Sequence, residues 1–266
     1  LDVNEFPDIP AFDDGGRFHE ITAGVLRVMI RRTTFAADKK DTTARFSLTA
    51  VLWEADGKGA RLIATDTKRL AVCSGPANVY GVADDVKAVH LVPLKAAMLL
   101  ERNLTGDSEV IRVGLRANDA LFQTECATIY TSLVQGKFPP YREIISKTAK
   151  EATQKVALPV AEFLSRVRQA AIMTDEESKR VDLTFDAGSV VLKARGANTG
   201  ASEVTLALPE YSGPKTEIAF DPSYLVEFLR AIENEPTVML EMSTGLRAAL
   251  FTCGEDYSYL VMPLTG

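Results

Sequence analysis

The chain has 266 residues, of which 46% are apolar and 25% are charged, and its formal net charge is −6. At roughly 100–200 residues per domain, this length indicates two domains, each large enough to bury a core without disulfides or a metal ion. No apolar run reaches the roughly 18–20 residues that cross a membrane, and the first residues do not resemble a signal peptide, so the sequence favours a cytoplasmic protein without a membrane partner.

A pattern of strand, helix start, amphipathic helix and further strands occurs four times along the chain. The strands that lead into the helices begin at residues 18, 88, 155 and 216, at intervals of 70, 67 and 61 residues. Such a repeat predicts the same structural unit four times rather than one enzyme-like centre. Residues 1–16, rich in Asp, Pro and Gly, are expected to be a connector in front of the first strand.

Each of the four helices is predicted from apolar side chains that recur three and four residues apart. Thr22 and Asp221 are placed to cap the first and fourth helices, and Pro93, Pro159 and Pro222 suit a first helical turn. The apolar stripes consist of Val25, Leu26, Met29 and Ile30; Ala96, Leu99 and Leu100; Val160, Phe163, Leu164, Val167 and Ala171; and Leu225, Phe228, Leu229 and Ile232.

Alternating apolar and polar residues predict the strands that follow the helices. They are expected at 45–53, 109–115, 127–134, 180–185, 190–194 and 237–242. The predicted fold class is α+β, with repeated domains in which two helices are backed by antiparallel β-sheets. We place the two domains at 17–145 and 151–266, with a boundary in the polar stretch 144–155.

Cations are concentrated on the predicted helices although the whole chain is acidic. Residues 22–35 carry Arg27, Arg31 and Arg32 and no acidic residue. If the helices line one surface, that surface could contact phosphates without reading bases; the alternative is an ordinary solvated helix face. The candidate DNA-facing residues are Arg27, Arg31, Arg32, Lys95, Arg102, Arg166 and Arg168.

No catalytic or metal-binding motif is present in the sequence. The two histidines, His19 and His90, lie in predicted strands, and the HExxH, GxSxG, GxGxxG and GxxxxGK[ST] patterns do not occur. Asp66 is expected to cap a turn, and the three cysteines form no CxxC pair. The sequence therefore predicts a protein that is not an enzyme and needs no metal or other cofactor. A small hydrolase or transferase on a repeated scaffold is the alternative of a different class.

Three segments carry a family resemblance: LIATDTKRLAVCS at 62–74, QGKFPPYREII at 135–145 and YLVMPL at 259–264. They resemble motifs of the bacterial DNA polymerase III β-subunit family of sliding clamps. In addition, 4–10 resembles the linker into the family's second domain, and 168–177 resembles a segment of its third. The resemblance implies the second and third of three clamp domains, with the first absent. In the family, two full-length chains close head-to-tail into a ring with the helices inside.

The resemblance also implies a pocket that binds short hydrophobic peptides. Thr67 and Lys68 stand where a Gly-His pair is common in the family, Glu143 where an Arg is frequent, and Ser178 where a Phe can occur. The matching pocket residues are Leu48, Thr65, Thr67, Lys68, Arg69, Leu70, Pro139, Ile144, Asp221, Tyr224, Leu246, Ala248, Leu260, Val261, Met262, Pro263 and Leu264. The apolar pair at the ring interface matches Ile172 and Met173, and Glu203 is nearly alone among the acidic residues expected there.

The function implied by the resemblance is that of a processivity factor. It would encircle double-stranded DNA without sequence preference and tether the catalytic subunit of the replicative DNA polymerase. Clamp-loader subunits, repair polymerases, ligase and mismatch-repair proteins would bind through QLxLF-like peptides. The protein would be a homodimer when full length, and this chain alone is expected to be monomeric or weakly associated. The second alternative is a peptide-binding adaptor that never meets DNA, for which Arg27, Arg31 and Arg32 would have no use.

Overall fold

The computed structural model describes residues 10–13, 16–39, 46–81, 88–174, 179–196, 200–243 and 246–265, so most of the expected connector at 1–16 lies outside the described residues. The chain divides into two compact units. The first contains Leu1–Ala64 and Cys73–Phe138, and the second contains Thr65–Val72 and Pro139–Gly266. The short segment Thr65–Val72 therefore belongs to the second unit, which no local property of the sequence indicated. Among the described residues, no helix has the length and apolar character needed to cross a membrane.

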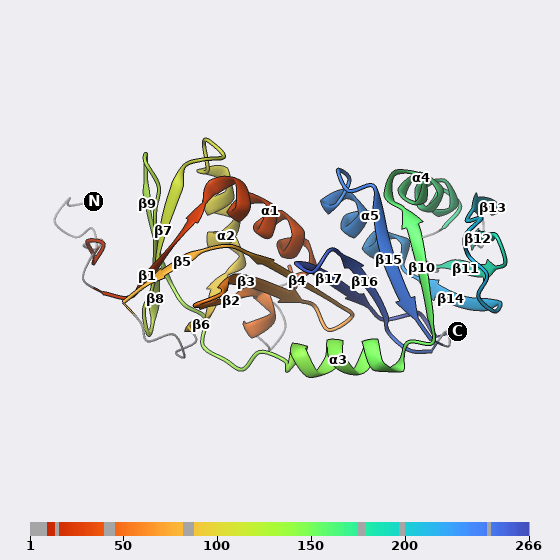
Figure 1. The fold of residues 1–266 in the computed structure, drawn as a ribbon, viewed down its shortest axis with the longest axis horizontal. Helices are drawn as coiled ribbons and strands as arrows, with labels where there is room; N and C mark the ends of the chain where they lie inside the picture. The colour runs from red at the N-terminus through yellow and green to blue at the C-terminus, as the bar shows by residue number, and fades with distance from the viewer. Residues whose placement is uncertain are drawn as a thin grey trace. The chain divides into compact units, whose positions relative to one another are not determined.

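In the described residues of the first unit, two α-helices are accompanied by antiparallel sheets; Figure 1 shows their arrangement. The helices are α1 (Ala23–Thr33) and α2 (Leu94–Arg102). One sheet has the strand order β5-β1-β7-β8-β9, with bounds Asn78–Tyr80, Phe18–Thr22, Val110–Leu115, Asp119–Gln123 and Thr128–Ser132. In the other, β2 (Ala50–Asp56) pairs with both β3 (Gly59–Thr65) and β6 (Ala88–Pro93). The expected antiparallel backing of two helices is confirmed in this unit.

The core of the first unit forms between α1 and its sheets. The predicted stripe residues Leu26, Met29 and Ile30 are buried, and each such side chain contributes roughly 1.5–3 kcal/mol by leaving water. Trp53 is fully buried, with its ring centroid 5.5 Å from that of Phe122. The indole Nε1–H of Trp53 donates to Nε2 of His19 at 3.0 Å, so the buried polar end of the ring is satisfied.

The second unit is built from α3 (Tyr141–Glu151), α4 (Val160–Ala171), α5 (Pro222–Ala231) and two antiparallel sheets. One sheet has the order β13-β12-β11-β14, with bounds Gly200–Ala207, Ser189–Gly196, Val181–Asp186 and Thr216–Phe220. The other runs β10-β15-β16-β17, with bounds Gln154–Pro159, Thr237–Met242, Ala249–Cys253 and Tyr257–Val261. The first residues of β4 (Arg69–Gly75) also belong to this unit.

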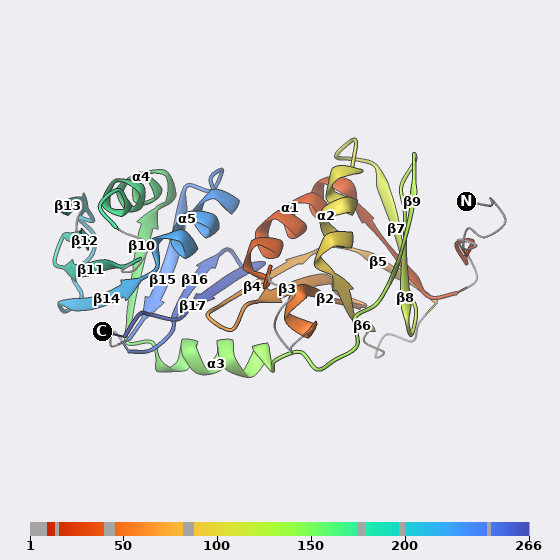
Figure 2. The same cartoon turned by 180° about the vertical axis from the view of Figure 1, so that it is seen from behind.

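Helices α4 and α5 lie side by side on one face of the second unit (Figure 2) and enclose its core with the two sheets. The stripe predicted for the fourth helix, Leu225, Phe228, Leu229 and Ile232, is buried throughout. The rings of Phe228 and Tyr259 stack with centroids 4.4 Å apart and planes 7° apart. This aromatic contact fixes α5 against β17, the strand that precedes the C-terminal segment.

Helix α3 is the largest difference from the sequence-based expectation. The stretch 144–155 was interpreted as a polar boundary, yet eleven residues from Tyr141 to Glu151 are helical. Tyr141 is the one helix residue that is buried, so the helix lacks the apolar stripe by which the other helices were predicted. It is held at its ends instead, by buried Tyr141 and by an ion pair between Glu151 and Arg247.

Smaller corrections concern the starts of elements. Residues Phe46–Thr49 form a 3-10 turn, so only the second half of the strand expected at 45–53 exists, as part of β2. Asp221 caps α5 through its side chain, as predicted, whereas Thr22 occupies the N-cap position of α1 without a side-chain hydrogen bond. Pro222 lies in the first turn of α5, while Pro93 and Pro159 each stand one residue before their helix.

Candidate functional site

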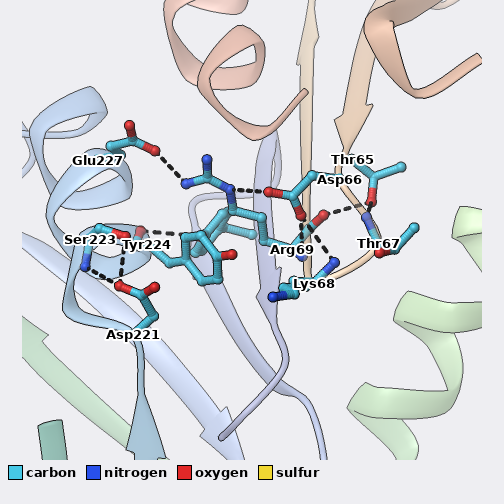
Figure 3. A network of polar contacts seen from close by, with 10 residues as sticks. Thr65, Asp66, Thr67, Lys68, Arg69, Asp221, Ser223, Tyr224 and Glu227 are labelled. Atoms are coloured by element: carbon cyan, nitrogen blue, oxygen red, sulfur yellow. Dashed lines mark hydrogen bonds and ion pairs between the residues drawn. The ribbon is translucent and has the colours of Figure 1, made fainter. Parts of the chain in front are cut away.

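The turn between β3 and β4 is organised by the side chains that precede it (Figure 3). Oδ1 of Asp66 accepts the backbone N–H groups of Lys68 and Arg69, both at 3.0 Å. The hydroxyl of Thr65 donates to the carbonyl of Arg69 at 2.6 Å. The turn-capping role expected for Asp66 is therefore confirmed. Thr67, at the tip, has a φ of 76°, a left-handed conformation that glycine adopts without cost and a β-branched residue does not.

Arg69 connects this turn to helix α5. Its Nε donates to Oδ2 of Asp66 at 2.9 Å, and its Nη1 donates to Oε2 of Glu227 at 2.5 Å. The guanidinium carbon lies 4.4 Å from the centroid of the Tyr224 ring, a cation–π contact. Burial by itself lowers the pKa of Arg69, but Tyr259, Glu227 and Asp66 outweigh that effect and raise it. Arg69 is only 6% exposed and charged, so it holds neighbouring groups in place rather than facing a ligand.

The start of α5 positions Tyr224. Oδ1 of Asp221 accepts the backbone N–H of Ser223 at 2.8 Å and its hydroxyl at 2.6 Å, which satisfies one backbone donor of the helix N-terminus. The hydroxyl of Tyr259 donates to the carbonyl of Tyr224 at 3.1 Å. Burial raises the pKa of Tyr224, and Asp66 and Asp221 raise it further, so the phenol is neutral at physiological pH. The ring of Tyr224 is thus a neutral, rigid surface with Arg69 over it.

The C-terminal segment lies beside these elements. The N–H of Met262 donates to the carbonyl of Lys68 at 2.8 Å, and the N–H of Leu264 donates to the carbonyl of Ala219 at 2.8 Å. Met262 is 44% exposed and Leu246 is 73% exposed, so both apolar side chains are accessible to a ligand. Leu246 and Leu264 also line one hollow of about 560 Å³ on the β11–β14 side of the second unit.

The residues predicted for a peptide pocket fall into two groups. Seven are buried and support the structure: Leu48, Thr65, Arg69, Leu70, Leu260, Val261 and Pro263. Ten are exposed or half-buried and can meet a ligand: Thr67, Lys68, Pro139, Ile144, Asp221, Tyr224, Leu246, Ala248, Met262 and Leu264. Leu48 lies in the first unit, where its carbonyl accepts the N–H of Asp38 at 2.9 Å. Six of the ten, all in the second unit, are the candidate peptide site. We call them the apolar surface after the four apolar or aromatic members, with Thr67 and Lys68 at its polar edge: Thr67, Lys68, Tyr224, Leu246, Met262 and Leu264.

Sequence reasoning missed Glu227 and Ser223, which complete the polar framework beneath the apolar surface. Glu227 follows Tyr224 by three residues, so both lie on one face of α5. From that spacing, Glu227 could have been predicted to lie close to a side chain that packs on the Tyr224 ring. Nothing in the sequence indicates that the side chain on the ring is Arg69.

The cations predicted to face DNA differ in how they are held. Arg27 forms an ion pair with Asp107 and donates to the carbonyl of Leu104 at 3.1 Å. Arg31 Nε lies 2.6 Å from Glu101 Oε1. These acidic partners lie in α2 and in the loop after it. The absence of acidic residues from 22–35 therefore does not leave Arg27 and Arg31 unpaired. Lys95, Arg102 and Arg168 are exposed, Arg32 is half-buried, and half-buried Arg166 donates to the side chain of Gln169 at 3.0 Å.

The two residues predicted for a ring interface lie directly after α4. Ile172 is 70% exposed and Met173 is half-buried. Glu203 is paired with Lys193 at 3.2 Å, and Ser178 and the acidic residues 175–177 lie outside the described residues. Within the part of the chain that the structure describes, no cluster of His, Cys, Asp and Glu could hold a metal ion.

Comparison with protein families shows which family the chain belongs to. The model of the DNA polymerase III β-subunit central domain matches residues 20–140, and that of its C-terminal domain matches 148–265. The chain belongs to the DNA polymerase III β-subunit family. Two β sliding clamps are among its relatives. That of Pseudomonas putida is 29% identical over 265 residues, covering 99% of this chain and 70% of that protein. That of Chlamydia pneumoniae is 26% identical over 264 residues, covering 99% and 69%.

Solved structures of β-subunit family members share the fold. The β subunit of Pseudomonas aeruginosa superimposes with a TM-score of 0.89 at 28% identity, over 100% of this chain and 70% of that one. A sliding clamp from the same organism, solved with griselimycin bound, has a TM-score of 0.89 at 27% identity, with the same coverage. The α+β clamp fold predicted from the sequence is therefore confirmed.

Proposed function

We propose that this chain acts as a non-catalytic DNA sliding clamp, which holds a DNA polymerase and other partners on duplex DNA. Family membership and the sliding-clamp names of its relatives support the general role. The observation that carries the finer proposal is the apolar surface: exposed Met262 bonds to the carbonyl of Lys68, next to Arg69, and exposed Leu246 shares a hollow with Leu264. Large exposed apolar side chains on a rigid polar frame are typical of a site that binds an apolar peptide.

The apolar surface suits a short hydrophobic peptide of the QLxLF type. The thioether of Met262 can adapt to different side chains, because methionine is flexible and polarisable. Tyr224 offers a rigid wall, since Arg69 covers it and the Asp221 cap fixes the start of its helix. Lys68, at the rim, offers a cation to polar or acidic groups of the peptide. One such surface would serve the replicative polymerase, clamp-loader subunits and repair proteins in turn.

Contact with DNA would use the exposed helix cations. Arg102 and Arg168 are exposed at the ends of α2 and α4, in the first and second units. Contacts of this kind neutralise phosphates without reading bases, which is compatible with sliding. Ring closure around DNA would use the exposed Ile172 and its neighbour Met173 against a second chain.

The test is a titration of a fluorescent QLxLF peptide against the purified chain. We expect saturable binding in the micromolar range, about −8 kcal/mol. Met262→Ala should weaken it at least tenfold, whereas Met239→Ala, at a methionine 36% exposed on β15, should leave it unchanged. A folded chain that does not bind the peptide, or that binds it equally well in both variants, would refute the proposed surface.

A peptide-binding adaptor without DNA contact is the second candidate function. The ion pairs of Arg27 with Asp107 and of Arg31 with Glu101 favour it, because they reduce the charge that α1 can offer to phosphates. Binding to a nicked circular duplex, measured against salt concentration, separates the two candidates. For a clamp, the logarithm of the association constant should fall with the logarithm of the salt concentration, with a slope of about −0.9 for each phosphate contact. The slope should be less steep in the double variant Arg102→Glu, Arg168→Glu. An adaptor should show no binding at any salt concentration.

A further inference from the structure

Strand β10 leaves one edge of its sheet open. Among the described residues it pairs only with β15, at the end of the order β10-β15-β16-β17. The N–H of Val160 donates to the carbonyl of Pro236 at 3.1 Å, and Leu158 lies opposite Val238. Because hydrogen-bonded pairs alternate in an antiparallel ladder, Lys155 and Ala157 point their N–H and C=O groups away from β15. The open edge therefore offers two donors and two acceptors to another extended backbone.

A cleft of about 680 Å³ runs along this edge, entirely within the second unit. We call it the β10 cleft; its lining includes Lys155, Ala157, Pro159, Glu162, Glu210 and Tyr211. The opposite wall is the segment 207–214, which follows β13. Figure 1 shows β10 running from the end of α3 to the start of α4. A cleft of this volume is within the range of ~300–1,000 Å³ that holds a small ligand or a few peptide residues.

The opposite wall is fixed by polar contacts rather than being a loose loop. The hydroxyl of Tyr211 contacts the side-chain oxygen of Gln154 and donates to the carbonyl of Pro214 at 3.1 Å. The side chain of Gln154 in turn contacts the hydroxyl of Thr216. A Cβ placed on Gly213 would come within 2.6 Å of the Tyr211 hydroxyl oxygen, so glycine allows the ring to lie against the backbone there. The cleft is therefore already formed without a ligand.

The charge of the β10 cleft is acidic. Three charged residues line it, Lys155, Glu162 and Glu210. Nζ of Lys155 lies 2.9 Å from Oε1 of Glu241, which neutralises the one cation. Glu162 and Glu210 are exposed and remain as the net charge of the lining. Burial raises the pKa of the Tyr211 phenol on the opposite wall, so this side chain adds no charge to the lining at physiological pH.

We propose that the β10 cleft binds an extended peptide segment carrying lysine or arginine, which adds to the sheet as a strand beside β10. The peptide backbone would pair with the N–H and C=O groups of Lys155 and Ala157, as in other edge-strand recognition. Its basic side chain would reach Glu210 or Glu162. This site is distinct from the apolar surface, and none of its residues belongs to that surface.

The experiment uses the ¹⁵N-labelled full chain and the probe acetyl-Val-Lys-Val-Lys-Val-amide. We expect saturable amide shifts at Lys155 and Ala157, and at least tenfold weaker binding of the same peptide with glutamate in place of lysine. Ala157→Pro removes one edge donor without touching the ladder to β15 and should abolish binding, whereas the control Ala157→Ser should retain it. Glu210→Lys should weaken binding at least fivefold, and Glu255→Lys, at an exposed turn between β16 and β17, should not.

Several results would overturn the proposal. A probe methylated on the central backbone nitrogen should bind much more weakly; equal binding would exclude strand addition, even if Ala157→Pro fails to fold. The proposal would also be overturned if the lysine peptide shifted neither the Lys155 nor the Ala157 amide signal. It would likewise be overturned if those signals shifted when the protein concentration alone was raised. In the latter case a second copy of the chain would cover the edge. Binding of the QLxLF peptide is measured on the same samples, so failure at one site is distinguishable from failure at the other.

Discussion

Arg69 and Glu227 are 158 positions apart in the sequence, and a 2.5 Å ion pair joins their side chains. The pair links the turn that carries Lys68 to the helix that carries Tyr224. The apolar surface therefore depends on a residue that is itself only 6% exposed. Arginine is suited to this place because its planar fork bonds Asp66 and Glu227 together while its face covers a ring.

Substitution of Arg69 should affect both stability and peptide affinity. Arg69→Ala leaves two carboxylates without their shared partner and should cost about 3–5 kcal/mol. Arg69→Lys keeps the charge but not the fork, and we expect about tenfold weaker QLxLF binding, or ~1.4 kcal/mol. Urea denaturation and peptide titration measure the two effects. The control Arg180→Lys alters a more exposed pair with Asp182 and should change neither, whereas unaltered binding in Arg69→Lys would contradict a positioning role.

Thr67→Gly should stabilise the protein. With a φ of 76°, the threonine is held in a left-handed conformation that costs an L-residue roughly 1–2 kcal/mol. Part of the gain is lost to the greater freedom of glycine in the unfolded chain, so we expect a net gain of about 0.5–1 kcal/mol. The change is measured by urea denaturation, with Thr131→Gly in β9 as a control that should destabilise. A loss of stability in Thr67→Gly would show that the strain is compensated by contacts of the side chain.

The cap of α5 can be tested separately from any contact between Asp221 and a peptide. Asp221→Ala removes the acceptor for the backbone N–H of Ser223 and should cost about 1 kcal/mol of unfolding free energy. Asp221→Ser supplies another acceptor and should restore most of that loss. If both variants bind the QLxLF peptide equally weakly although only one is destabilised, the carboxylate contacts the peptide directly.

His19 should make the free energy of unfolding decrease as the pH falls. Burial, with smaller contributions from Arg17 and His90, lowers the pKa of His19 from 6.5 to about 3. Below pH 6.5 the unfolded chain therefore binds a proton that the folded chain does not. The stabilisation is fully present above pH 6.5 and is lost as the pH falls toward 3, by up to about 4–5 kcal/mol.

The measurement for His19 is the free energy of unfolding between pH 7 and pH 4, compared with His19→Gln. A glutamine oxygen can accept the Trp53 indole N–H but does not titrate. The variant should lose stability less steeply over this range. Equal slopes for the two proteins would mean that the carboxylates alone cause the acid sensitivity.

The strands and the repeated helices were predictable from the sequence because their periodicity is local. The predicted strand starts at 18 and 216 are those of β1 and β14, and the strand predicted at 237–242 has the bounds of β15. Helix α3 was not predictable by the same route, since one buried tyrosine makes no stripe. Leu99 shows the opposite error: it fits the stripe of α2 but is 49% exposed.

The candidate site was predictable only in part. Family motifs indicated the segments that carry the apolar surface, but not which of their residues are buried supports. The partners of Arg69, Arg27 and Arg31 depend on which side chains the fold brings together. Arg27 is paired with Asp107, a residue 80 positions away, and no spacing rule reaches that far.

The assignment of Thr65–Val72 to the second unit has a consequence for modularity. The chain passes between the units three times, after Ala64, Val72 and Phe138, rather than once. A gene fragment that encodes Pro139–Gly266 alone would omit Lys68, whose carbonyl accepts the N–H of Met262, and Arg69, the partner of Glu227. Recombination near Phe138 would therefore separate Lys68 and Arg69 from the groups to which they bond, so a transplanted second domain would need the 65–72 segment supplied with it.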